Sequence, residues 1–188
     1  MEKIISLDYF FTNLLNRLIP HNLFFNLFFS FFSLKGSSIL IWLLVILLSV
    51  ILEERKNPGI TKQDKKFSIL FSVSFLLTFL FSDVVLKNLF HRPRPQLIST
   101  NFNLFQFISN SCPTNLSFPS THAATAFAAA TVLTFFDKKR RWFYYTVAVI
   151  ISYSRIYLGC HYFLDVIAGA IIGWLITKLI LRFSISNK

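Results

Sequence analysis

The sequence predicts an all-α fold, an integral membrane bundle of about five transmembrane helices preceded by interfacial N-terminal helices. Two observations favour it. The 188 residues are 54% hydrophobic, with 24 Phe against 8 acidic residues, and few soluble domains share that composition. The charged residues are also clustered, and the apolar runs between clusters are long enough to cross a hydrocarbon core about 30 Å thick.

Residues 1–36 are expected to lie at the membrane interface. Between residues 4 and 18 apolar side chains recur at helical spacing, with Asn13, Asn16 and Arg17 between them, which indicates an in-plane amphipathic helix. After Pro20, the apolar piece at 23–34 looks too short to span, so we expect a re-entrant or interfacial segment, with a full span as the alternative. The start lacks the pattern of a cleaved leader, and we expect it to be retained.

Residues 37–188 are expected to form one membrane-embedded bundle. Its predicted spanning helices cover 37–52, 67–86, 121–136, 142–158 and 162–181. The last helix carries Gly169 and Gly173, a spacing that lets helix backbones approach closely.

The net charge of +11 does not predict nucleic-acid binding, because the cations lie in short patches beside apolar runs. This pattern fits anionic headgroups and membrane topology. If the five helices alternate, twelve of the 19 Lys and Arg residues fall on one side, which is cytoplasmic by the positive-inside rule. The other seven face outward, and we expect those near residues 87–94 and 155 to lie beside the chemistry.

Three stretches on the outward side carry candidate chemistry. At the end of the second span, Lys87 and Arg94 are donors suited to a phosphoryl group, and Asp83 lies one turn before Lys87, where it can steer the ammonium. His91 and Arg92 are possible accessory donors in the same stretch, with membrane anchoring as the alternative for these basic residues.

The second and third stretches contribute two histidines. Ser120 or Thr121 is a candidate N-cap for the Ala-rich helix that carries His122, and free amides at such a helix start can bind an anion. His161 and Asp165 are four residues apart, so the carboxylate can hold one imidazole nitrogen and leave the other basic. A structural His–Asp pair is the alternative.

Taken together, the three motifs resemble the type 2 phosphatidic acid phosphatase family, whose sites are similar to those of vanadium haloperoxidases. The resemblance covers residues 83–165. The matching residues are Lys87, Arg94 and Pro95, then Pro119, Ser120 and His122, then Ser154, Arg155, His161 and Asp165. Thr121 stands where the family usually has Gly, which puts the local amide geometry in question.

The resemblance implies a phosphohistidine mechanism. His161 is the expected nucleophile, His122 the general acid and base, and Asp165 the orienting carboxylate. The expected phosphate-binding residues are Lys87, Arg94, Ser120, Thr121 and Arg155. With three fixed cations and no carboxylate cluster, we expect no cofactor and no metal.

The expected substrate is a lipid phosphate of the outer leaflet, because the stretch 96–118 is uncharged and rich in Phe. Undecaprenyl diphosphate, lipid A 1-phosphate and phosphatidylglycerol phosphate are the candidates. The alternatives are a lipid phosphotransferase of the same family and a non-enzymatic scaffold or anion-conducting protein. The expected location is a bacterial inner membrane, with the site facing the periplasm. The expected partners are the bilayer and its lipid, without a protein partner or nucleic acid.

Cys112 and Cys160 fit neither a metal site nor a C-x-x-C redox pair. If the site faces outward, both cysteines share an oxidising compartment, where a disulfide can persist. A bridge between them and two free thiols both remain open, since the sequence does not give their separation.

Overall fold

The computed structural model describes residues 2–33, 37–52, 61–95, 112 and 116–186, and within these ranges every regular element is a helix. The N-terminal helices are α1 (Glu2–Leu18) and α2 (Leu23–Ser33). The bundle consists of α3 (Ser37–Leu52), α4 (Lys62–Phe79), the π-helical η1 (Leu80–Leu86), α5 (Lys87–Phe90), α7 (Thr121–Phe136), α8 (Arg141–Tyr157) and α9 (Phe163–Ser186). The all-α prediction is confirmed.

The five predicted spans correspond to helices with nearby boundaries. The second is longer than expected, because α4, η1 and α5 follow one another without a break over Lys62–Phe90. A capping box fixes its start: the Thr61 side chain accepts from the Asp64 amide, and the Asp64 side chain accepts from the Thr61 amide. Lys62–Phe90 and Phe163–Ile185 are long and apolar enough to cross a membrane.

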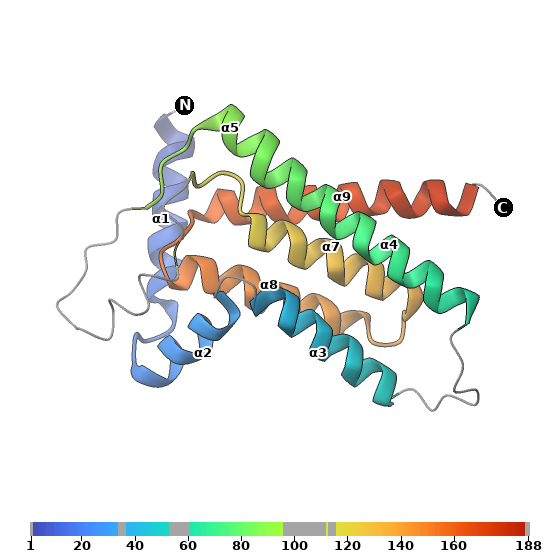
Figure 1. Ribbon diagram of the computed structural model, residues 1–188. Helices are drawn as coiled ribbons and strands as arrows, with labels where there is room; N and C mark the ends of the chain where they lie inside the picture. The colour runs from blue at the N-terminus through green and yellow to red at the C-terminus, as the bar shows by residue number, and fades with distance from the viewer. Residues whose placement is uncertain (1, 34–36, 53–60, 96–111, 113–115, 187–188) are drawn as a thin grey trace.

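Helix α7 is the centre of the bundle, packed against α4, α8 and α9 (Figure 1). Its Ala-rich sequence suits this position, because Ala123, Ala126 and Ala130 are fully buried and let neighbouring helices come close. Large apolar side chains of the outer helices point away from the core. Examples are Ile69, Leu76, Ile171 and Leu179, each at least half exposed. An apolar exterior of this extent suits contact with hydrocarbon.

The turns and helix ends that the structure describes gather at two opposite ends of the bundle (Figure 1). One end, the site end, holds α5, residues 91–95, the start of α7 and the turn between α8 and α9. The opposite end holds the α7–α8 turn, the start of α4 and the end of α9. Helix α1 runs across the site end, as expected for an in-plane helix.

Helix α2 stays at the site end. Its 11 residues extend about 16 Å, well short of a hydrocarbon core. Asn26 accepts a hydrogen bond from the Tyr157 hydroxyl at the end of α8, and Ser33 contacts Arg155 one half-turn earlier. The segment therefore does not reach the opposite end of the bundle.

Close contact between α7 and α9 depends on Gly169 and Gly173. A Cβ on Gly169 would run into the Ser120 carbonyl, and a Cβ on Gly173 into the Ala124 carbonyl. Both carbonyl oxygens belong to the helix backbone, so they cannot move away by a change of rotamer. The close approach predicted from the glycine spacing is confirmed.

Replacing Gly173 with Ala should therefore destabilise the protein. Helix propensity alone favours Ala by about 1 kcal/mol, but overpacking against a backbone carbonyl typically costs about 1–3 kcal/mol and should dominate. The midpoint of thermal unfolding in detergent should fall for Gly173→Ala and change little for Ile171→Ala on the exposed face of α9. A raised midpoint for Gly173→Ala would contradict the close packing.

Candidate active site

Residues from all three predicted stretches meet at the site end. Lys87 begins α5, Arg94 lies in the segment after α5, and His122 lies in the first turn of α7. Arg155 is in the last turn of α8, and His161 lies in the turn before α9. The charges of Lys87, Arg94 and Arg155 act on both histidines, so these side chains share one electrostatic environment. Their chemical roles remain predictions.

His161 is buried, with 1% of its surface exposed. Its Nε2 lies 2.9 Å from Nη1 of Arg94. Because a guanidinium can only donate, Nε2 accepts here and carries a lone pair, and the proton of the neutral ring is on Nδ1. Burial, followed by the positive charges of Arg155 and Arg94, holds the pKa of His161 well below its usual range. The imidazole is therefore neutral at neutral pH.

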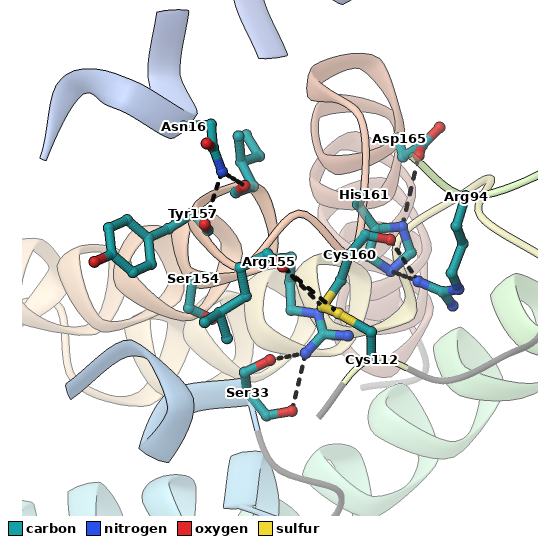
Figure 2. The surroundings of a disulfide bond; sticks show 12 residues. Asn16, Ser33, Arg94, Cys112, Ser154, Arg155, Tyr157, Cys160, His161 and Asp165 are labelled. Atoms are coloured by element: carbon teal, nitrogen blue, oxygen red, sulfur yellow. Dashed lines mark hydrogen bonds and ion pairs between the residues drawn. A yellow bond between two sulfur atoms is a disulfide. The ribbon is translucent and has the colours of Figure 1, made fainter. Parts of the chain in front are cut away.

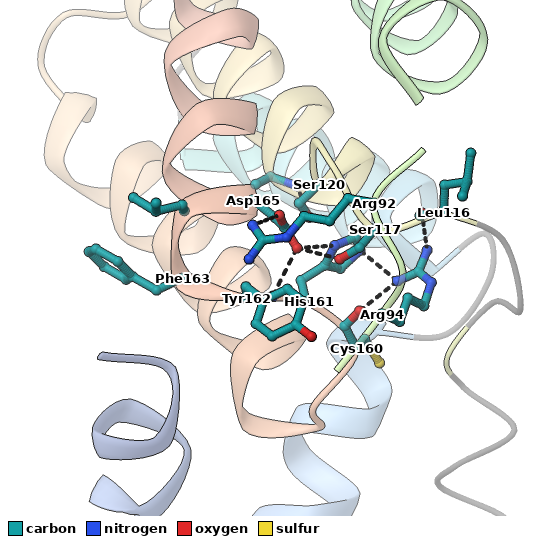
Figure 3. Close-up of polar contacts among 12 residues, drawn as sticks. Arg92, Arg94, Leu116, Ser117, Ser120, Cys160, His161, Tyr162, Phe163 and Asp165 are labelled. Carbon is teal, nitrogen blue, oxygen red and sulfur yellow. Dashed lines mark hydrogen bonds and ion pairs between the residues drawn. The ribbon is translucent and has the colours of Figure 1, made fainter. Parts of the chain in front are cut away.

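Asp165 faces the protonated side of this ring, as Figure 3 shows. Its Oδ2 is 3.6 Å from Nδ1 of His161, within ion-pair range but longer than a hydrogen bond. Oδ2 accepts hydrogen bonds from the Ser117 hydroxyl and, at 2.9 Å, from the Tyr162 amide. Oδ1 accepts from Nη1 of Arg92 at 2.7 Å. The carboxylate is thus fixed from several sides while it faces His161.

Arg94 connects the segments around His161. Besides His161, its guanidinium donates to the Cys160 carbonyl at 2.6 Å and to the Leu116 carbonyl at 3.1 Å. Burial lowers the pKa of Arg94, against the opposing charges of Asp165 and Asp83. A guanidinium remains a cation under such a shift.

Arg155 is fully buried, and only part of its guanidinium is satisfied. Nη1 donates to the Ser33 carbonyl at 2.9 Å and to the Ser33 hydroxyl (Figure 2). Among the residues that the structure describes, Nε and Nη2 have no hydrogen-bond partner. Leaving buried charged donors without partners is unfavourable by several kcal/mol, roughly 3–5 where one partner of a buried pair is missing. Two donors of a buried cation are therefore available to an anion.

Lys87 is buried and paired with Asp83, as the i, i+4 spacing predicted. Asp83 also accepts a hydrogen bond from the Thr121 hydroxyl at 2.9 Å. Thr121, in place of the usual Gly, therefore links the start of α7 to the Lys87–Asp83 pair. Ser120, the other candidate, is the N-cap, and its Oγ accepts from the Ala123 amide at 3.5 Å.

The two accessory candidates behave differently from the cations above. His91 is exposed and ends α5 in a left-handed conformation, with φ of 46°. Arg92 is engaged by two carboxylates, Asp165 and Asp8. Burial acts to lower the pKa of Arg92, but hydrogen bonds and charges from these carboxylates outweigh burial and raise it. The guanidinium of Arg92 is therefore engaged by carboxylates in this structure, and its accessory role stays a prediction.

Three side chains of this site were missed by sequence reasoning: Asp8, Ser33 and Ser117. Each is buried, and each bonds a residue at least 48 positions away. Only Asp8 had a sequence signal, as an acid within an apolar helix, which is by default a functional candidate.

Cys112 and Cys160 form a disulfide, with Cα atoms 5.3 Å apart. The bond lies beside His161, which follows Cys160. The backbone amides of both residues donate to the Arg155 carbonyl, at 2.9 and 3.1 Å (Figure 2). The bridge left open by the sequence is thus present in the structure. In the chain-entropy description, closing a loop of 48 residues stabilises the fold by roughly 3–4 kcal/mol.

Within the part of the chain that the structure describes, no group of three or more His, Cys, Asp or Glu side chains could hold a metal ion. Metal independence remains a prediction for experiment.

Comparison with known proteins places the chain in a family. A sequence model of the PAP2 superfamily matches residues 67–188, more than half of the chain. An undecaprenyl-diphosphatase of Sulfolobus acidocaldarius is 34% identical over 115 residues, which are 61% of this chain and 53% of that protein. The chain thus spans about half the length of that relative.

Two solved structures share the fold. Aquifex aeolicus LpxE superposes with a TM-score of 0.64 at 29% identity, covering 94% of this chain and 95% of that one. The first transmembrane PAP2-type phosphatidylglycerolphosphate phosphatase, from Bacillus subtilis, gives a TM-score of 0.63 at 24% identity, covering 100% and 89%. The latter likeness supports the fold alone.

The family predicted from the three spaced motifs is therefore confirmed, and this all-helical membrane protein belongs to the PAP2 superfamily.

Proposed function

We propose that this protein is a lipid phosphate phosphatase in which His161 is the covalent nucleophile. The observation that supports it most directly is the buried guanidinium of Arg155, with Nε and Nη2 unpartnered beside a neutral histidine. A phosphoryl group supplies the negative oxygens that these donors lack. The named relative, an undecaprenyl-diphosphatase, also removes phosphate from a lipid.

The first step is an in-line displacement at phosphorus. The lone pair on Nε2 of His161 forms an N–P bond while the P–O bond to the lipid breaks. His122 gives its proton to the leaving oxygen. A lipid alcohol departs from a monophosphate substrate, and a lipid monophosphate departs from a diphosphate substrate. Nη1 of Arg94 contacts Nε2 in this structure. When the phosphoryl group bonds to Nε2, Arg94 donates to a phosphoryl oxygen instead.

The second step is hydrolysis of the phosphohistidine. Water attacks phosphorus, His122 accepts a proton from it, the N–P bond breaks and inorganic phosphate leaves. Lys87, Arg94 and Arg155 stabilise charge on the equatorial oxygens in both steps, with the Ser120 hydroxyl and nearby amides. Asp165 stabilises the positive charge on His161 while the phosphoryl group is attached.

The substrate is an outer-leaflet lipid phosphate or diphosphate. Undecaprenyl diphosphate has the support of the named relative, whereas lipid A 1-phosphate and phosphatidylglycerol phosphate remain candidates from the resemblance. Most of the Phe-rich stretch 96–118 lies outside the described residues. Arg92 is not proposed to hold a second phosphate, because Asp8 and Asp165 occupy its guanidinium.

We place the protein in a bacterial inner membrane, with its site facing out of the cytoplasm. Residues 37–188 form the phosphatase bundle, and residues 1–36 form interfacial helices. The disulfide beside His161 supports this orientation, because such bonds persist in oxidising compartments. So does the charge distribution, since Lys138, Lys139, Arg140 and Arg141 lie at the opposite end.

The two histidines should be separable by experiment. His161→Ala should abolish phosphate release from a panel of lipid phosphates. His122→Ala should lower turnover about 10²–10⁴-fold, yet still form phosphohistidine slowly with an aryl phosphate whose leaving group needs no proton. Phosphohistidine is hydrolysed in acid. The phosphoenzyme should therefore be quenched in base and measured by radiolabel. Equal, complete loss of label in both variants would contradict the assignment.

Phosphate release by the wild type should be unchanged in EDTA, because the charge on the phosphoryl group is balanced by side chains. Loss of activity in EDTA, restored by a divalent cation, would show that the mechanism is incomplete. Release of free phosphate also distinguishes hydrolysis from transfer to an acceptor lipid.

Arg155→Lys tests the observation on which the proposal depends. Lysine keeps the charge but loses the fork that places Nε and Nη2, so kcat/KM should fall about 10²–10³-fold, as for loss of one preorganised donor. Arg141→Lys, at the opposite end, is the matched control and should retain wild-type activity. Full activity in Arg155→Lys would show that the guanidinium does not bind the phosphoryl group.

Orientation can be tested through the cysteines. An impermeant thiol reagent applied to intact cells should label Cys112 and Cys160 only after reduction. Labelling without reduction would contradict the disulfide but keep the orientation. Labelling that appears only after the cytoplasm is opened would overturn the outward-facing site.

A further inference from the structure

Helix α1 reaches the catalytic residues through Asp8, although it lies outside the family match at residues 67–188. Asp8 is 2% exposed. Its Oδ1 accepts from the Leu164 amide at 2.8 Å, in the first turn of α9. Its Oδ2 accepts from Nη2 of Arg92. One oxygen thus anchors the helix, and the other holds a cation.

The guanidinium of Arg92 lies between two carboxylates. Nη2 bonds Asp8 and Nη1 bonds Asp165, while the group stacks over the Tyr162 ring, 4.0 Å from its centroid. A planar fork held at both terminal nitrogens and on one face has little freedom to turn. The position of Asp8 therefore fixes the position of Arg92.

The same arrangement acts on His161 through Asp165. Arg92 bonds Oδ1 of Asp165, and Oδ2 is the oxygen that faces Nδ1 of His161. Two carboxylates share one guanidinium here, so the group of three keeps one net negative charge. That negative charge faces the imidazole of His161, which becomes positive when Nε2 is phosphorylated. Without the charge of Asp8, Arg92 would neutralise Asp165 and weaken its field at the nucleophile.

We propose that Asp8 is a positioning residue for the reaction, acting through Arg92 to orient Asp165 and to preserve its negative charge toward His161. This inference rests on the proposed phosphohistidine function. It makes the N-terminal helix part of the catalytic apparatus rather than a membrane anchor alone.

The competing explanation is that Asp8 only docks α1 onto α9. Thr12 provides a matched control, because its hydroxyl accepts from the Phe163 amide at 2.9 Å, one residue from the Asp8 contact, and it forms no bond to Arg92. Asp8→Asn keeps the oxygen that accepts from Leu164 but removes the charge and places an amide against Arg92. Thr12→Val removes that docking contact and the bond from the Thr12 hydroxyl to the Asp8 carbonyl within α1, but it keeps the Asp8 carboxylate and its bond to Arg92.

The experiment measures kcat and KM for phosphate release, with thermal midpoints, for both variants. Asp8→Asn should lower kcat on the order of ten- to a hundredfold, as a misplaced catalytic group does, with KM within about twofold. Thr12→Val should keep kcat within about twofold even if its thermal midpoint falls. In an Asp165→Asn background, adding Asp8→Asn should lower kcat no further, because Asp8 acts on His161 only through Asp165.

An unchanged kcat in Asp8→Asn would overturn the inference. So would equal kcat losses in Asp8→Asn and Thr12→Val, or losses that multiply in the Asp8→Asn/Asp165→Asn double variant, since these indicate docking alone. Failure of the proposed function looks different: the wild type would release no phosphate, or His161→Ala would release it at the wild-type rate. Either result would overturn both proposals.

Discussion

A guanidinium buried in a helix bundle, with two of its nitrogen donors unpartnered, constrains the rest of this structure. Within the described ranges the Arg155 side chain bonds Ser33 alone, and no carboxylate pairs with it. Lys87 and Arg94 add positive charge nearby, and each of the two interacts unfavourably with Arg155. Burying such a cluster is tolerable only if the fold holds it rigidly and an anion completes it. In the proposed function this cluster is a preorganised binding site for a phosphoryl group, whose negative charge offsets the cost of burying the cations.

Packing of α7 on α9 supplies this rigidity. Gly169 and Gly173 let the two backbones approach, and the Ser120 amide then donates to the Asp165 carbonyl at 2.9 Å. This one bond sets the start of the helix that carries His122 against the start of the helix that carries Asp165. The disulfide and the Arg155 carbonyl hold the turn with His161 from the other side. The geometry of the candidate site therefore follows from backbone contacts as much as from side chains.

Much of this was predictable because the signals are local. The spans follow from apolar runs, the Lys87–Asp83 pair from i, i+4 spacing, and the meeting of three motifs from helix alternation. The partners of Asp8, Ser33 and Ser117 were not predictable, because they are distant in sequence. Asp8 alone carried a local signal, as an acid within an apolar helix. The pairing of Arg92 with Asp8 was hidden for the same reason, because the two residues lie 84 positions apart. An accessory role for Arg92 stays a prediction. The disulfide stayed open until the fold gave the separation of its two cysteines.

The most direct test of the account is a structure with orthovanadate, whose five-coordinate form resembles the phosphoryl group in transfer. We predict vanadium bonded to Nε2 of His161, with its oxygens within hydrogen-bond distance of Nε or Nη2 of Arg155 and of the Arg94 guanidinium. Vanadate bonded to another residue, or bound while Arg155 keeps its two donors unpartnered, would contradict the claim that a buried cation cluster completed by an anion is the basis of this site.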